Sequence, residues 1–165
     1  MMNSVTISAA SKYKETALRI LSYLILCLNL INFAHADISL RDIHQHKIPF
    51  SSLKGKWVFI NYWASWCKPC VEEIEELNAF YMKNKDKMAL FAVNYEGLSL
   101  AKQRKLIKEY GLLYPSLSRD PAKALALGDL RGVPATFVFN PEGKWVDTLY
   151  GGQTLGSLNA VMDEA

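Results

Sequence analysis

Two cysteines stand in the segment Trp66-Cys67-Lys68-Pro69-Cys70 of this 165-residue chain. They directly follow an apolar run, Trp57 to Trp63, whose aromatic and β-branched composition is typical of a strand buried on both faces. A Cys-x-x-Cys pair at the point where a strand gives way to a helix is typical of thiol–disulfide exchange. The spacing predicts both sulfurs at the same end of the first helical turn, close enough to form and break a bond.

The N-terminus of the expected helix indicates which cysteine attacks first. Unpaired backbone N–H groups and the helix dipole at that end favour the thiolate of Cys67, so Cys67 is the expected nucleophile. It attacks a disulfide in a partner, and Cys70, shielded by the helix, then attacks the mixed disulfide and releases the reduced partner. Lys68 adds a cation beside Cys67, whereas glutamates in the following turns oppose it. The sequence therefore leaves the net pKa shift of Cys67 open.

The first 36 residues have the pattern of an export signal. Their basic residues come first, and these are Lys12, Lys14 and Arg19. An apolar stretch over 20–33 follows and ends in the small-x-small site Ala34-His35-Ala36. We therefore expect a signal peptide over 1–36 and one folded domain over 37–165, exported to the periplasm or to the outer face of the membrane. An uncleaved anchor is the alternative, although the stretch is shorter than the roughly 20 residues of a spanning helix.

The composition limits the classes of partner and cofactor. Without the leader, 16 basic and 15 acidic residues remain, because three of the 19 basic and one of the 16 acidic residues lie before Ala36. This balance, with no Lys/Arg cluster, argues against nucleic acid as a partner. Covalent haem needs a histidine after the second cysteine, where this chain has Val71, and structural zinc usually needs a second ligand pair. We expect no metal and no cofactor beyond the redox-active disulfide, and we expect His44 and His46 to be solvated.

Hydrophobic periodicity predicts an α/β fold with a central mixed sheet and helices on both faces. Strands are expected over 38–41, 57–63, 88–94, 136–139 and 144–149, the last two joined by a turn over 140–143. Helices are expected over 68–83, 99–110, 122–127 and 155–163. In the first of these helices the acidic residues are expected to face water, and these are Glu72, Glu73, Glu75 and Glu76.

Three motifs together resemble the thioredoxin superfamily. They are the Cys-x-x-Cys segment after an aromatic strand, Gly132-Val133-Pro134-Ala135-Thr136-Phe137, and Asn140-Pro141-Glu142-Gly143. More narrowly, the chain is similar to the secreted TlpA/ResA-like thiol–disulfide oxidoreductases, which include the cytochrome c maturation reductases. The resemblance implies a thioredoxin-like fold, with Pro134 as a cis-proline opposite the cysteine pair. It also implies a substrate-binding surface made by Trp66, Lys68, Pro69 and the backbone of Val133.

The resemblance also bears on proton transfer. Ordinary thioredoxins have a buried aspartate six residues before the first cysteine, where this chain, like the TlpA/ResA-like branch, has Asn61. That branch commonly has a glutamate just beyond the next strand, and Glu96 is the candidate here, with Gly97 in the alternative register. A partly buried Glu96 with a raised pKa would take the proton of Cys70 when Cys70 attacks. The alternative is a carboxylate in a solvated loop.

The resemblance implies an exported enzyme that reduces disulfides of specific envelope proteins. Apocytochrome c, with its Cys-x-x-Cys-His segment, is the expected substrate, and a metallochaperone for oxidase assembly is the second candidate. The expected electron donor is a membrane thiol-reductant transporter of the DsbD/CcdA type, and the protein is expected to be a monomer. Two alternatives stay open, an oxidant that introduces disulfides and a non-catalytic module that holds a metal or a partner. Lys68-Pro69 between the cysteines favours the reductase.

Overall fold

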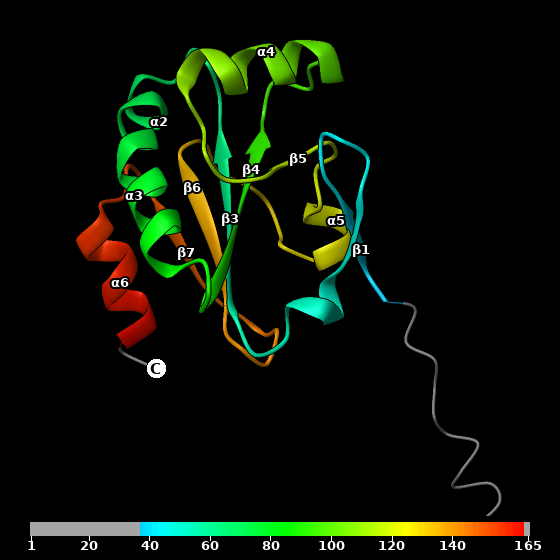
Figure 1. The fold of residues 1–165 in the computed structure, drawn as a ribbon, viewed down its shortest axis with the longest axis vertical. Coiled ribbons are helices and arrows are strands. Elements are labelled where there is room, and N and C mark those ends of the chain that lie inside the picture. The colour runs from blue at the N-terminus through cyan, green and yellow to red at the C-terminus, as the bar shows by residue number, and fades with distance from the viewer. Residues whose placement is uncertain (1–36, 164–165) are drawn as a thin grey trace, which may run out of the picture. The chain divides into compact units, whose positions relative to one another are not determined.

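The structure is a computed structural model, and it describes residues 37–163. The signal peptide expected over 1–36 lies outside the described residues. Between residues 37 and 163, no helix has both the length and the apolar character that crossing a membrane requires. The described part of the chain is an α/β fold built around a five-stranded sheet (Figure 1).

The central sheet is mixed and has the strand order β5-β4-β3-β6-β7. Its middle strand, β3 (Trp57–Trp63), is parallel to β4 (Met88–Asn94) and antiparallel to β6 (Ala135–Phe139). The edge strands are β5 (Ser116–Leu117), parallel to β4, and β7 (Trp145–Tyr150), antiparallel to β6. The segment that carries the cysteines therefore leaves the sheet from its central strand, where the backbone is held on both sides.

Alternate residues of β3 belong to two hydrophobic cores, one on each face of the sheet. Phe59 and Trp63 lie in the core that also contains both cysteines, whereas Val58, Ile60 and Tyr62 lie in the other. Every residue of this strand after the first is buried. The absence of polar alternation in its sequence thus predicted correctly that both of its faces are covered.

Four helices contribute side chains to the core on the cysteine side of the sheet. They are α2 (Lys68–Glu72), α3 (Ile74–Asn84), α4 (Leu100–Tyr110) and α6 (Leu155–Asp163). Helices α3 and α6 lie side by side (Figure 1). An edge-to-face contact between Phe59 and Phe80, with ring centroids 5.0 Å apart, joins β3 to α3. This packing fixes the helical segment after the cysteines against the strand before them.

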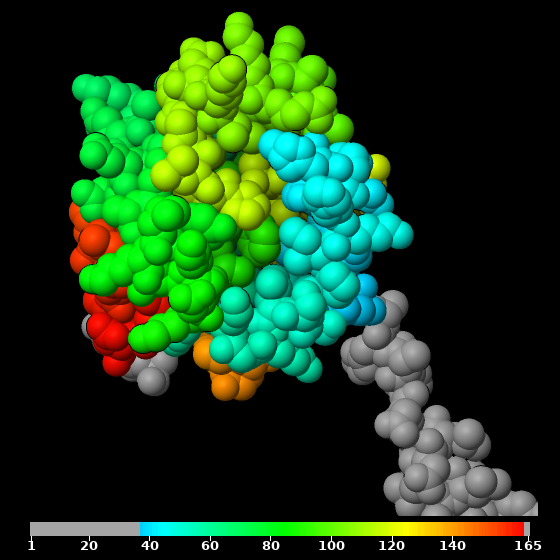
Figure 2. All heavy atoms as spheres, viewed as in Figure 1, coloured from blue at the N-terminus to red at the C-terminus, as the bar shows by residue number. Residues whose placement is uncertain are grey.

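The opposite face is covered by shorter elements. They are the hairpin of β1 (Ser39–Arg41) and β2 (Lys47–Pro49), the 3-10 helix η1 (Phe50–Leu53) and α5 (Ala122–Leu125). The hairpin also covers the β5 edge, because the N–H of Ile43 donates to the carbonyl of Ser116 at 3.0 Å. Figure 2 shows the hairpin, in cyan, against the yellow-green segment between α4 and α5. Helical elements therefore lie on both faces of the sheet, as predicted.

Three local predictions were incomplete or wrong. Strands β2 and β5 were not predicted, because two or three residues are too few to give a periodic pattern. The helix expected over 122–127 ends at Leu125, because Ala126 has a left-handed backbone (φ 52°). The helix expected over 68–83 is interrupted at Glu73 (φ −79°, ψ −10°), which separates α2 from α3.

Candidate active site

A disulfide joins Cys67 and Cys70, whose Cα atoms are 5.2 Å apart. Cys67 is the N-cap of α2, and its Sγ accepts a hydrogen bond from the backbone N–H of Cys70 at 3.3 Å. A tight turn connects the pair to β3, because the N–H of Cys67 donates to the carbonyl of Ala64 at 3.2 Å. The sulfur of Cys67 therefore faces N–H groups of a helix terminus, which favours its thiolate once the disulfide is reduced.

The two sulfurs differ in their access to solvent. Cys67 is 5% exposed, whereas Cys70 is fully buried. Trp66, directly before Cys67, is 67% exposed, and Lys68 and Pro69 are also exposed. Of the two cysteines, only Cys67 thus has exposed surface, and it lies beside the exposed Trp66. This asymmetry suits Cys67 as the attacking sulfur and Cys70 as the resolving one.

The peptide bond between Val133 and Pro134 is cis, as the resemblance implied. Val133 packs against the core that contains both cysteines. The N–H of Gly151 donates to the carbonyl of Pro134 at 3.0 Å, and a Cβ on the next residue, Gly152, would lie 3.7 Å from the carbonyl oxygen of Pro69. The cis-proline loop therefore lies close to the first turn of α2. Among the described residues, the N–H and C=O of Val133 have no hydrogen-bond partner.

Glu96 lies next to the cysteine turn, but its carboxylate is held by strong hydrogen bonds. It accepts the N–H of Ser65 at 2.8 Å, the Ser65 hydroxyl at 2.9 Å and the Asn94 amide at 2.9 Å. Burial raises the pKa of Glu96, but these three hydrogen bonds outweigh it and hold the pKa below its usual value. The predicted raised pKa was therefore wrong. The ionised Glu96 ties the loop after β4 to the turn before Cys67.

A second carboxylate, Glu73, lies three residues after Cys70 and is only 3% exposed. Its Oε1 accepts a hydrogen bond from Asn61 Nδ2 at 2.8 Å, and its Oε2 accepts the backbone N–H of Gln153 at 2.8 Å. Burial raises the pKa of Glu73, and the two hydrogen bonds offset this only in part. The prediction that Glu73 faces water was wrong, because α2 ends at this residue and its carboxylate meets the amide of Asn61.

Asn61 was the sequence signal that could have revealed this carboxylate. It is the one amide in a run that is otherwise apolar, and it is fully buried in β3. A buried amide needs partners, so a polar side chain had to come from a neighbouring element. Besides Glu73, Asn61 Nδ2 donates to Thr136 Oγ1 of β6 at 3.0 Å. Asn61, Glu73 and Thr136 form a buried polar cluster on the α2 side of the sheet.

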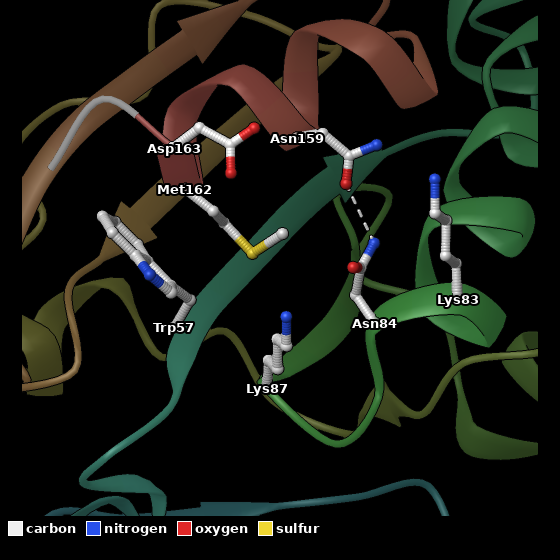
Figure 3. A pocket seen from close by; sticks show the side chains of 7 residues that line it. All are labelled: Trp57, Lys83, Asn84, Lys87, Asn159, Met162 and Asp163. Carbon is white, nitrogen blue, oxygen red and sulfur yellow. Dashed lines mark hydrogen bonds between the residues drawn. The ribbon is translucent and has the colours of Figure 1, made fainter.

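A separate hollow lies at the opposite end of β3 and has a volume of about 380 Å³. Its lining residues are Trp57, Lys83, Asn84, Lys87, Asn159, Met162 and Asp163. Figure 3 shows the Asn84 amide donating to Asn159 Oδ1 at 3.0 Å, with Met162 beside Trp57. Because Trp57 begins β3 and the cysteines follow its end, a strand length of about 20 Å separates this hollow from the disulfide. The hollow is therefore not part of the cysteine site.

The histidines of the β1–β2 turn are tied to a neighbouring acid. His46 Nδ1 lies 2.9 Å from Asp42 Oδ2, and the backbone N–H groups of His44 and His46 donate to Asp42 Oδ1 at 2.8 Å. Between residues 37 and 163, no cluster of three or more His, Cys, Asp and Glu side chains is arranged to hold a metal ion.

Comparison with known proteins assigns the chain to a family. The profile described as the AhpC/TSA family matches residues 31–147, more than half of the chain. The chain belongs to the AhpC/TSA family. Thiol-disulfide oxidoreductase ResA of Bacillus subtilis (strain 168) is 34% identical over 125 residues, which is 75% of this chain and 69% of that protein. ResA of Bacillus anthracis is 31% identical over 122 residues, 73% of this chain and 70% of that protein.

Two solved structures share the fold of this chain. The exposed lipoprotein thioredoxin Etrx1 from Streptococcus pneumoniae strain TIGR4 superimposes with a TM-score of 0.67 at 25% identity, over 79% of this chain and all of that one. StoA from Bacillus subtilis gives a TM-score of 0.61 at 24% identity, over 77% of this chain and 96% of that one. The resemblance seen in the sequence is thus confirmed: the chain is a thioredoxin-like thiol–disulfide oxidoreductase, similar to ResA.

Proposed function

We propose that this protein acts outside the cytoplasm as a reductase of specific envelope proteins, with the Cys67–Cys70 dithiol as electron donor. The observation that supports this most is the cysteine pair at the start of α2, in which Cys67 keeps a small exposed surface beside Trp66 and Cys70 is fully buried. The leader pattern over 1–36 and the similarity to an exposed lipoprotein thioredoxin support the location. Lys68-Pro69 between the cysteines favours reduction over oxidation.

The reaction takes place in two sulfur transfers. The thiolate of Cys67 attacks the client disulfide, so that one sulfur of the client bonds to Cys67 and the other leaves as a thiolate, which is then protonated. Cys70 loses its proton and attacks the Cys67 sulfur, which forms the internal disulfide and releases the remaining client sulfur as a second thiol. Two electrons pass from the protein to the client in each cycle.

The second transfer needs a base, because burial disfavours the thiolate of Cys70. Glu73 fits this role better than Glu96. It follows Cys70 by three residues along the same helical turn, it is buried, and burial raises its pKa toward the range in which a general base works. Glu96, with a lowered pKa and three strong hydrogen bonds, instead positions the loop beside the cysteine turn.

Client binding uses the surface around Cys67. The free N–H and C=O of Val133, next to the cis-Pro134 bond, are suited to pair with an extended client segment, and the exposed Trp66 offers an apolar contact. Apocytochrome c is the proposed client, with a metallochaperone as the second candidate. A membrane transporter of the DsbD/CcdA type would reduce the disulfide again, and the protein would work as a monomer without a metal or cofactor.

The test has two parts. Insulin reduction in the presence of dithiothreitol should be fast with wild type and should fall to the uncatalysed rate with Cys67→Ser. The equilibrium potential of the couple and its redox state in cells then decide the direction, and a low potential with a reduced steady state is expected. A steady state that is fully oxidised would mark an oxidant. Equal insulin rates together with stoichiometric copper or zinc in the isolated protein would favour the metal-holding alternative.

A further inference from the structure

Glu73 shares its buried site with two side chains that can change hydrogen-bonding roles, Asn61 and Thr136. We propose that Asn61 and Thr136 form a hydrogen-bond switch that serves Glu73 in both of its protonation states, which makes Asn61 a positioning residue for proton transfer from Cys70. The inference rests on the proposed function, in which Glu73 takes that proton.

In the structure the cluster is arranged for the ionised carboxylate. Both hydrogens of Asn61 Nδ2 are used, one toward Glu73 Oε1 at 2.8 Å and one toward Thr136 Oγ1 at 3.0 Å. The backbone N–H of Gln153 occupies the other carboxylate oxygen at 2.8 Å. Both oxygens of Glu73 therefore accept a hydrogen bond, and bonds of this kind to a charged group are the stronger ones.

The arrangement must change when Glu73 gains its proton at Oε1, the oxygen that Asn61 contacts. An O–H at Oε1 would point at the Nδ2 hydrogens of Asn61, so two donors would face each other in a buried place. Rotation of the amide by half a turn removes this conflict, because Oδ1 then takes the position of Nδ2 and accepts the O–H of Glu73. The Thr136 hydroxyl both accepts and donates, so it can turn and donate to the same Oδ1.

One atom in the structure is consistent with this rotation. Asn61 Oδ1 is buried and has no hydrogen-bond partner among the described residues. No bond therefore holds the far side of the amide in place, and after rotation the Nδ2 group would take over that unpartnered position. Rotation therefore breaks no hydrogen bond on that side of the amide, and the proton on Glu73 selects the orientation.

Other titratable groups lie near Glu73 in the chain or in space. Cys70 precedes it by three residues, and Glu76 follows it by three with its Oε2 accepting the N–H of Leu155. Tyr114, in the segment before β5, is close enough for the charge of Glu73 to act on it. Burial raises the pKa of Tyr114, and the charge of Glu73 raises it further, so Tyr114 stays neutral at working pH. Asn61 is the side chain that donates to Glu73 in the structure, and its amide can offer either a donor or an acceptor.

The switch is tested directly in the full-length wild-type chain by NMR. Above the titration midpoint of Glu73, the Asn61 side-chain amide hydrogens should show nuclear Overhauser effects to the Thr136 side chain, and below the midpoint these should be lost as the amide turns. Contacts that persist unchanged on both sides of the midpoint would overturn the proposal. This measurement needs no variant, so it is independent of any folding defect.

Exchange kinetics supply the second readout. The rate at which a peptide disulfide oxidises the reduced protein is measured as a function of pH. One limb of this profile is expected to follow the titration of Glu73 and to disappear in Glu73→Gln. In Asn61→Leu, which removes the donor to the charged form, that limb should move up by about one pH unit. Asn84→Leu, a matched change in the distant hollow, should leave the limb in place. If the midpoint of this limb stayed at its wild-type pH in Asn61→Leu, the inference would be contradicted. If the limb were still present in Glu73→Gln, the role given to Glu73 in the proposed function would be contradicted instead.

Discussion

Removal of the Glu96 carboxylate should destabilise the turn before the cysteines without altering the chemistry of exchange. Glu96→Ala loses hydrogen bonds to the Ser65 N–H, the Ser65 hydroxyl and the Asn94 amide. At about 1 kcal/mol net for each, the free energy of unfolding should fall by about 3 kcal/mol. Glu96→Gln keeps an acceptor oxygen, and its new amide can donate to the Ser65 hydroxyl. We therefore expect Glu96→Gln to lose only about 1 kcal/mol, for the missing charge.

The pH dependence has a definite sign. Because the folded pKa of Glu96 lies below its usual value of 4.5, the stabilisation is present above that pH and is lost as the pH falls through the folded pKa. Thermal unfolding from pH 7 to pH 3 should thus show a gap between wild type and Glu96→Gln of about 4 °C at neutral pH that closes in acid. If Glu96→Gln unfolded like wild type at pH 7 but shifted the pH profile of exchange, the proton-relay role first predicted for Glu96 would be right and the present interpretation wrong.

Three other substitutions test the packing, the backbone and the client surface. Leu77 is fully buried on α3, so Leu77→Ala should lower the free energy of unfolding, measured by urea denaturation, by about 3 kcal/mol. A loss below about 1 kcal/mol would mean that this face of α3 is not part of the core. Gly111 is the left-handed C-cap of α4 (φ 67°), and a Cβ there would meet no atom within 4 Å. Gly111→Ala should therefore lower the free energy of unfolding by about 1 kcal/mol through backbone strain alone. An unchanged free energy of unfolding would refute the left-handed conformation. Trp66 is exposed, so Trp66→Ala should change the free energy of unfolding by no more than about 0.5 kcal/mol. It should raise KM for a protein disulfide but not for a small-molecule disulfide. An equal rise in KM for the two substrates would exclude a contact between Trp66 and the client.

The elements with strong periodic patterns could be predicted from the sequence. The strand over Trp57–Trp63 and the helix over Leu155–Asp163 have the bounds expected, because each has a continuous hydrophobic signal. The helix Leu100–Tyr110 also agrees, because Ser99 precedes it and Gly111 ends it as expected, although the Ser99 side chain makes no capping hydrogen bond. Strand β5 could not be predicted, because its two residues pair only through contacts with β4.

The acid–base part of the site was harder to predict than the sulfur part. The roles of Cys67 and Cys70 follow from local spacing and the direction of one helix. The environments of Glu73 and Glu96 depend on residues far away in the chain, since the partners of Glu73 include Gln153, 80 residues further on. A regular helical pattern placed Glu73 in water, and only the buried amide of Asn61 indicated otherwise.

The mechanism depends most on the different roles of the two sulfurs, with Cys67 attacking and Cys70 resolving. The direct test is to mix reduced Cys70→Ser and reduced Cys67→Ser, separately, with a peptide that contains a disulfide, and to measure covalent adducts by mass spectrometry. Cys70→Ser is expected to accumulate one mixed disulfide at Cys67, whereas Cys67→Ser, left with the fully buried sulfur, should form almost none. Faster or equal trapping by Cys67→Ser would show that Cys70 is the attacking residue and would contradict the mechanism.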